Sequence, residues 1–138
     1  MSYKFYYNEK EYELNEKNFK EFYNDEEKPV IGIDTDKVIN ILNNNENVNV
    51  EKAYYGECCE TCKEGKVEEK KFFDYLEINF YIFTKNGEFV ISNIEKEYEG
   101  LSFNKLLKQK KVDNSYIVTV SICKYCGEYS IIIEEIDI

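Results

Sequence analysis

Two Cys-x-x-Cys pairs constrain the fold of this chain more than any other feature of its sequence. The first spans Cys59 to Cys62, and the second spans Cys123 to Cys126, which Gly127 follows directly. Thiolates suit Zn²⁺ at about 2.3 Å in a tetrahedron, and two intervening residues let a tight turn aim both sulfurs at one point. The spacing therefore predicts one structural zinc ion per chain, held by Cys59, Cys62, Cys123 and Cys126.

These two motifs resemble the paired knuckles of zinc ribbons. Gly127 fits that pattern because such turns often end with φ > 0, which glycine adopts at little cost. The first motif departs from it, since Lys63 stands where a ribbon has glycine and Gly65 comes two residues later. The gap of about 60 residues between the pairs is also longer than in a simple ribbon.

The cysteines leave other interpretations open. Cys58 could replace Cys59 as a ligand, because Cys58 and Cys62 form a second possible pair. Metal-free reduced thiols and a disulfide or redox pair are the alternatives to zinc, although five cysteines cannot all pair. A redox motif normally opens a helix, which lowers the thiol pKa, whereas Cys123 follows an expected strand. Four thiolates leave no open position for water, so a bound zinc ion would be structural.

Charge and composition exclude several kinds of chemistry. The net charge is −10, there is no His, and every basic residue is Lys. A triad that needs His is therefore excluded, and bidentate Arg contacts to phosphate or guanine are unavailable. An acidic body repels a phosphate backbone, so we expect no nucleic-acid partner and favour a basic protein.

Length and hydrophobicity predict one globular domain over residues 1–138. The chain is 43% hydrophobic and 16% aromatic, which is enough to build a core and argues against disorder. The first residues are interrupted by charge and do not form a signal peptide, and no stretch is long enough to span a membrane. We therefore expect a cytoplasmic protein with reduced thiols and no membrane contact.

The first half of the chain predicts a hairpin and two helices. Aromatic residues alternate with polar ones on both sides of a turn at residues 8–10, which indicates an N-terminal β-hairpin. Asn15 can cap a helix in which Phe19, Phe22 and Tyr23 share a face. A second helix follows residues 34–35, and a strand then leads into the first cysteine motif.

The second half predicts a long hairpin, a third helix and two strands. Asn86-Gly87 is a strong type I′ turn signal. Counting back from the turn places Ile82 opposite Ile91 and Thr84 opposite Phe89, with a wet or partner-facing side made of Tyr81, Phe83, Val90 and Ser92. A helix capped by Ser102 and strands on both sides of the second cysteine motif complete the chain. The predicted class is α+β: a mostly antiparallel sheet of hairpins with about three short helices and two Cys-x-x-Cys knuckles.

Two longer runs carry a resemblance to a family. They are Phe-Tyr-Ile-Phe-Thr-Lys-Asn-Gly-Glu at residues 80–88 and Tyr-Ile-Val-Thr-Val-Ser-Ile-Cys-Lys-Tyr-Cys-Gly at residues 116–127. With them, the whole chain resembles an uncharacterised family of small proteins from low-GC bacteria, a domain of unknown function. That resemblance implies no activity, substrate or partner.

The sequence supports three functional hypotheses. The first is a non-enzymatic, zinc-stabilised acidic module that binds a basic protein. The second is an inhibitor or immunity protein that mimics nucleic acid, which would need carboxylates arrayed on one face. The third is a thiol redox protein. Charge and the absence of His favour the first hypothesis.

Overall fold

The computed structural model describes residues 2–46, 48–64 and 71–136. Eight strands, one helix of nine residues, a six-residue helical segment and a 3-10 turn occur within these residues. In chain order they are β1 (Tyr3–Tyr7), β2 (Lys10–Leu14), β3 (Phe19–Tyr23), α1 (Thr35–Asn43), β4 (Val50–Tyr55), β5 (Phe73–Lys85), β6 (Glu88–Ser92), η1 (Lys96–Tyr98), α2 (Phe103–Lys108), β7 (Asn114–Cys123) and β8 (Tyr129–Glu135).

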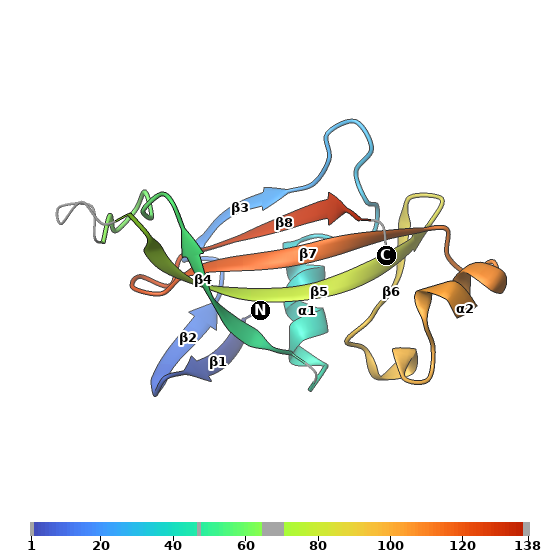
Figure 1. The fold of residues 1–138 in the computed structure, drawn as a ribbon, viewed down its shortest axis with the longest axis horizontal. Helices are drawn as coiled ribbons and strands as arrows, with labels where there is room; N and C mark the ends of the chain where they lie inside the picture. Colours follow the sequence, from blue (N-terminus) through green and yellow to red (C-terminus); the bar gives the residue numbers. More distant parts are fainter. Residues whose placement is uncertain (1, 47, 65–70, 137–138) are drawn as a thin grey trace.

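A six-stranded mixed sheet forms the centre of the molecule (Figure 1). The strand order is β3-β8-β7-β5-β4, and β6 also pairs with β5. The 13-residue strand β5 pairs with β7 on one side, while β4 and then β6 share its other side. The β3–β8 pair is parallel, whereas the other pairs are antiparallel. Strands β1 and β2 form a separate hairpin.

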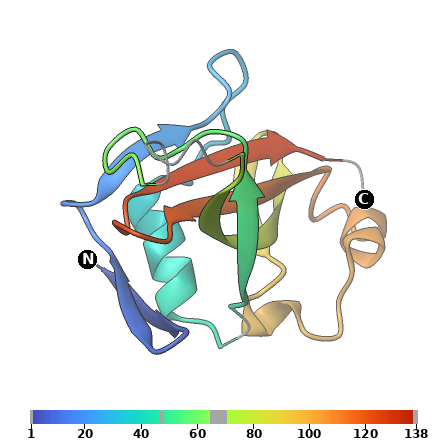
Figure 2. The same ribbon diagram turned by 60° about the vertical axis from the view of Figure 1, so that its left-hand side comes forward.

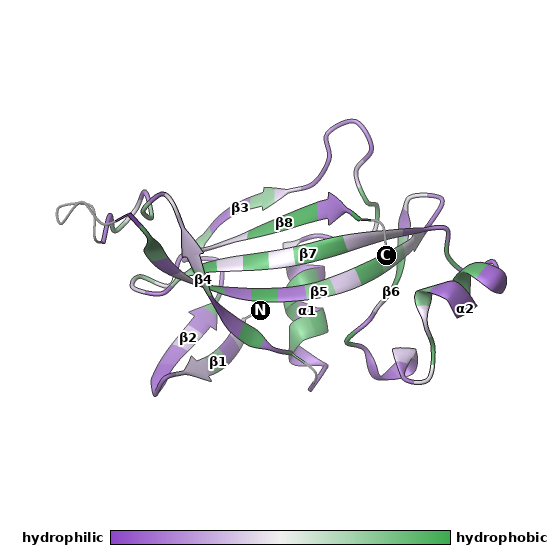
Figure 3. Cartoon of the chain, in the orientation of Figure 1, coloured by the Kyte–Doolittle hydropathy of each residue, from purple (hydrophilic) through white to green (hydrophobic). Residues whose placement is uncertain are grey.

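The main core lies between one face of this sheet, helix α1 and the β1–β2 hairpin (Figure 2). Hydrophobic and hydrophilic residues alternate along β5 and β7, which gives the sheet one apolar face (Figure 3). The strands supply the following fully or nearly fully buried side chains to the core: Leu76, Ile78, Phe80, Ile82, Val118, Val120, Ile122, Tyr129, Ile131 and Ile133.

Helix α1 is present where the sequence predicts it, and the reason is local. Asp34 caps it by accepting a 2.8 Å hydrogen bond from the backbone N–H of Lys37. Its apolar residues then fall on one face and are buried against the sheet: Val38, Ile39, Ile41 and Leu42. The amphipathic period and the cap therefore agree on the same element.

The predicted α+β class with an antiparallel sheet and about three helices is wrong. The described chain is mostly β, its sheet is mixed, and the helix predicted after Asn15 is the strand β3. A register shift between Phe19 and Glu21 explains the misleading pattern, because it lets Phe19 and Phe22 pair with Tyr129 and Ile131 on one face. A strand with a bulge thus imitates the spacing of a helix.

The β5–β6 hairpin has the predicted turn, but only part of the predicted register. Asn86 and Gly87 both have positive φ, at 53° and 82°, and Thr84 pairs with Phe89 as predicted. Beyond that pair the register shifts, so that Ile82 lies opposite Ser92 and not opposite Ile91. The shift leaves one extra residue, at position 90, on the β6 side.

The expected wet side of this hairpin is therefore wrong at two positions. Phe83 and Ser92 are both buried, whereas Val90 is 44% exposed. Phe83 belongs to a second, smaller core with Leu106 and Val112, which covers the far end of the opposite sheet face. The segment that carries α2 therefore buries a surface that an isolated hairpin would leave in water.

No helix in the described part of the chain is long and apolar enough to cross a membrane. That residues 1–138 form one domain, and that the protein is cytoplasmic, remain predictions.

We expect Phe83→Ala to lower the free energy of unfolding by about 3–5 kcal/mol, since it removes a large buried ring from the second core. Val90→Ala, in the same hairpin but exposed, should change it by less than about 0.5 kcal/mol. Urea denaturation of both variants measures the difference. Equal effects would show that Phe83 faces solvent.

Candidate metal centre

The second cysteine motif is the turn between β7 and β8. Cys123 is the last residue of β7, and its backbone N–H donates to the carbonyl of Glu128 at 2.9 Å. The N–H of Gly127 donates to the carbonyl of Cys123 at 2.9 Å. Gly127 has φ of 81°, as the sequence predicts for the end of a knuckle.

The first motif follows β4 and has the same backbone geometry. The N–H of Lys63 donates to the carbonyl of Cys59 at 2.9 Å, which matches the bond from Gly127 to Cys123. Lys63 has φ of 53°, so a lysine occupies the left-handed position that glycine holds in the other knuckle. The departure from the ribbon pattern therefore does not change the turn. Gly65 lies outside the described residues.

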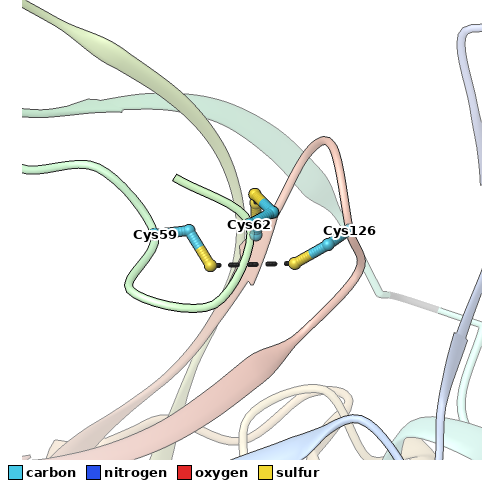
Figure 4. A group of neighbouring side chains, drawn as sticks. Cys59, Cys62 and Cys126 are labelled. Carbon is cyan, nitrogen blue, oxygen red and sulfur yellow. Dashed lines mark hydrogen bonds between the residues drawn. The ribbon is translucent and has the colours of Figure 1, made fainter. Parts of the chain in front are cut away.

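The two turns bring four sulfur atoms together. Figure 4 shows three of these cysteines, Cys59, Cys62 and Cys126. The Sγ atoms of Cys59 and Cys126 are 3.7 Å apart, and those of Cys62 and Cys123 are 3.6 Å apart. All four Sγ atoms lie within 4.8 Å of one another. Four sulfurs at about 2.3 Å from one ion would be about 3.8 Å apart in a regular tetrahedron. The separations of 3.7 and 3.6 Å are close to that value, and no pair is more than 4.8 Å apart.

These separations do not correspond to disulfides, and all five cysteines are free. A disulfide would bring two sulfurs to about 2.05 Å. Cys58 is half-buried and does not belong to the group of four. The structure therefore brings together the four cysteines that the sequence selects and leaves out Cys58, the alternative ligand.

Burial and backbone amides act in opposite directions on the thiols. Burial would raise the pKa of Cys59, but hydrogen bonds from the backbone N–H groups of Cys62 and Thr61, with those from neighbouring thiols, hold that pKa below its ordinary value. At Cys123 burial dominates and raises the pKa. Burial also raises the pKa of Cys126. A group of thiols in which Cys59 and Cys123 are buried, and which receives amide donors, is suited to a cation, which would favour the thiolate forms.

Residues of the β1–β2 hairpin and of the segment that follows it donate hydrogen bonds to the second knuckle, which the sequence did not indicate. The hydroxyl of Tyr12 donates to the carbonyl of Lys124 at 2.8 Å, and Lys10 Nζ donates to the same carbonyl at 3.1 Å. The side-chain amide of Asn18 donates to the carbonyl of Gly127 at 3.1 Å. These bonds span more than a hundred residues, so no local pattern could reveal them.

Two further contacts join the first knuckle to the sheet. Thr61 Oγ1 donates to Glu128 Oε2 at 2.6 Å, and Lys20 Nζ lies 3.2 Å from Glu60 Oε2. Each contact links the first motif to β3 or to the turn before β8. The knuckles are thus positioned by protein contacts as well as by any ion that they hold.

The fold and this site define a class of protein: a mostly β protein whose mixed sheet carries a cluster of four cysteines that could bind a metal at one end. Within that class, the chain belongs to the family described as "Protein of unknown function (DUF3785)", whose model matches residues 3–138. This match confirms the resemblance to an uncharacterised family, and it carries no statement about bacterial source or zinc ribbons. No curated protein and no solved structure matches the chain.

We expect Gly127→Ala to destabilise the protein by about 1–2 kcal/mol, because the left-handed conformation is unfavourable for alanine. A Cβ at this position would meet only Asn18, at 3.8 Å, so the cost comes from the backbone and not from a clash. Lys63→Ala is the matched control: it keeps a non-glycine residue at the equivalent position and should change stability by less than about 0.5 kcal/mol. Thermal unfolding of both variants tests this, and an equal loss in both would show that the cost at Gly127 does not come from its left-handed backbone.

Proposed function

We propose that the chain binds one Zn²⁺ ion through Cys59, Cys62, Cys123 and Cys126, and that the ion is structural. The observation that carries this proposal is the group of four Sγ atoms within 4.8 Å, supplied by two turns with equal backbone geometry. Soft thiolates in a tetrahedral arrangement suit zinc, and four of them leave no position for water.

An ion at this site would act as a cross-link between distant parts of the chain. The two motifs are separated by a segment of about 60 residues, and closing a loop of that length removes about 4 kcal/mol of conformational freedom from the unfolded chain. Because a zinc ion would bind the folded chain and not the unfolded one, its binding free energy would add to the stability of the fold. Metal and fold therefore support each other.

We further propose that the protein is a non-enzymatic binding module whose partner is a basic protein. Its net charge of −10 supports this. Among the residues that the structure describes, one ion pair is formed, between Lys20 and Glu60, so most carboxylates are not neutralised by a neighbouring lysine. Such a surface attracts a cationic partner, and the attraction should weaken as salt rises.

The two other hypotheses remain alternatives that experiments can separate. A nucleic-acid mimic would compete with DNA or RNA for a nuclease or similar basic enzyme. A thiol redox protein would cycle between thiols and a disulfide. Against the latter, neither motif opens a helix among the described residues, so the helix N-terminus that activates such thiols is missing at both.

Elemental analysis of protein purified without added metal should find one zinc ion per chain. Cys59→Ser and Cys123→Ser should each lose the zinc and lower the unfolding midpoint strongly, because each removes a ligand. Cys58→Ser is the matched control, since its sulfur lies outside the group of four, and it should keep the zinc. Metal-free protein with reduced thiols, or a disulfide detected by mass, would contradict the zinc proposal.

Binding to a lysine-rich or arginine-rich model peptide should be measurable at low salt and fall steeply as the salt concentration rises. Calorimetric titration at several salt concentrations provides the measurement, with a glutamate-rich peptide of equal length as the control. Failure to bind any basic peptide at low salt would remove the support for a basic partner.

A further inference from the structure

A hollow lies next to the cysteine cluster, on the sheet face opposite helix α1. Its volume is about 460 Å³. The floor consists of outward-facing side chains of β4, β5, β7 and β8, including Tyr55, Tyr75 and Ser121. The loop of residues 56–60, which we call the strap, lines another side as it leaves β4 and runs toward β3 (Figure 2).

The strap is held at its far end by the contacts of the first knuckle. Glu60 pairs with Lys20 on β3, and Thr61 bonds to Glu128 before β8. Cys59 is the strap residue that belongs to the sulfur cluster. The hollow therefore takes its shape from the same turns that bring the four cysteines together.

The lining of the hollow is aromatic and acidic. The rings of Tyr55 and Tyr75 are stacked with their centroids 4.2 Å apart, and Tyr23 stands at the rim with half of its surface exposed. Four carboxylates and a single lysine line the space: Glu21, Glu57, Glu60, Glu128 and Lys20. Four thiolates around one Zn²⁺ would add a net charge of about −2 beside it.

The one lysine shows what this environment favours. Lys20 Nζ lies 3.2 Å from Glu60 in the only ion pair formed among the described residues. The hydrogen bond to Glu60 raises the pKa of the Lys20 ammonium above its ordinary value. The carboxylates of Glu21 and Glu128 raise the same pKa further through their charge. The rim thus already stabilises one cationic side chain and keeps an excess of negative charge.

We propose that this hollow, bounded by the strap and the stacked tyrosines, receives an arginine side chain from the basic partner. The inference rests on the proposed basic partner and names where on the surface that partner docks. A planar guanidinium can stack on tyrosine rings while its N–H groups reach carboxylates, which an ammonium cannot do as well. An anion would be repelled by the carboxylates, and an apolar group would leave their charges uncompensated.

Binding of an arginine-containing peptide to the zinc-loaded protein tests the site. The probe is a flexible Gly/Ser peptide with two arginines, measured by calorimetry at about 20 mM salt, where exposed charges are weakly screened. The double variant Glu21→Gln/Glu57→Gln should weaken binding about fivefold. Its matched control, Glu97→Gln/Glu99→Gln, changes the net charge equally at exposed positions outside the hollow and should change affinity by less than about twofold.

Two further readouts separate this site from general charge attraction. In an NMR titration with the same peptide, the ring resonances of Tyr55 and Tyr75 should shift, whereas those of Tyr6, exposed on the separate hairpin, should not. A peptide with lysines in place of the arginines should bind about threefold more weakly, since it loses most of the stacking. Zinc content is measured on every sample, so that loss of the metal is not mistaken for loss of the hollow.

Each contrary result has a distinct meaning. If both double variants weaken binding equally, the hollow is not the docking site, while a basic partner remains possible. If the lysine peptide binds as tightly as the arginine peptide, arginine recognition is wrong. If the wild-type protein binds neither peptide at low salt, both this site and the proposed basic partner fail.

Discussion

The structure depends on the meeting of two turns that lie far apart in the sequence. β5 and β7 pair along their length, and the pairing of Tyr75 with Cys123 places the second knuckle beside the N-terminal end of β5. β4 pairs with the same end of β5, so the first knuckle, which follows β4, arrives at the same place. The sheet register therefore delivers the four sulfurs to one point, and a metal at that point would hold the register in turn.

The cysteine end and the opposite end of the sheet are covered in different ways on the face that α1 does not reach. Both ends have a face that α1 does not cover. At one end the α2 segment buries Phe83 in a small apolar core, and at the other the strap and the cysteine cluster cover part of the face. At the α2 end, apolar packing buries Phe83, Leu106 and Val112. The cysteine end remains open as a polar hollow, which is why it is the more suitable of the two ends for a ligand.

Several features were predictable because they are encoded locally. The Asn86-Gly87 turn and the cap of α1 by Asp34 depend on residues within a few positions of each other. The strand β3 was not predictable in this way, since its Phe19 and Phe22 share a face only through a bulge against β8. The burial of Phe83 was missed for a similar reason, because Tyr98, Phe103 and Leu106, which lie fifteen or more positions away, pack against it.

For the site, the sequence by itself determined which residue types could bind a metal and in what pairs. Cys-x-x-Cys spacing is a property of a single turn, so it can be recognised without the fold. Only the tertiary structure decided that Cys59 and not Cys58 joins the group, that Lys63 adopts the conformation of a glycine, and that an acidic, tyrosine-lined hollow lies alongside. The two knuckles lie about 60 positions apart and meet only through the pairing of β4 with β5 and of β5 with β7, and no local pattern contains that information.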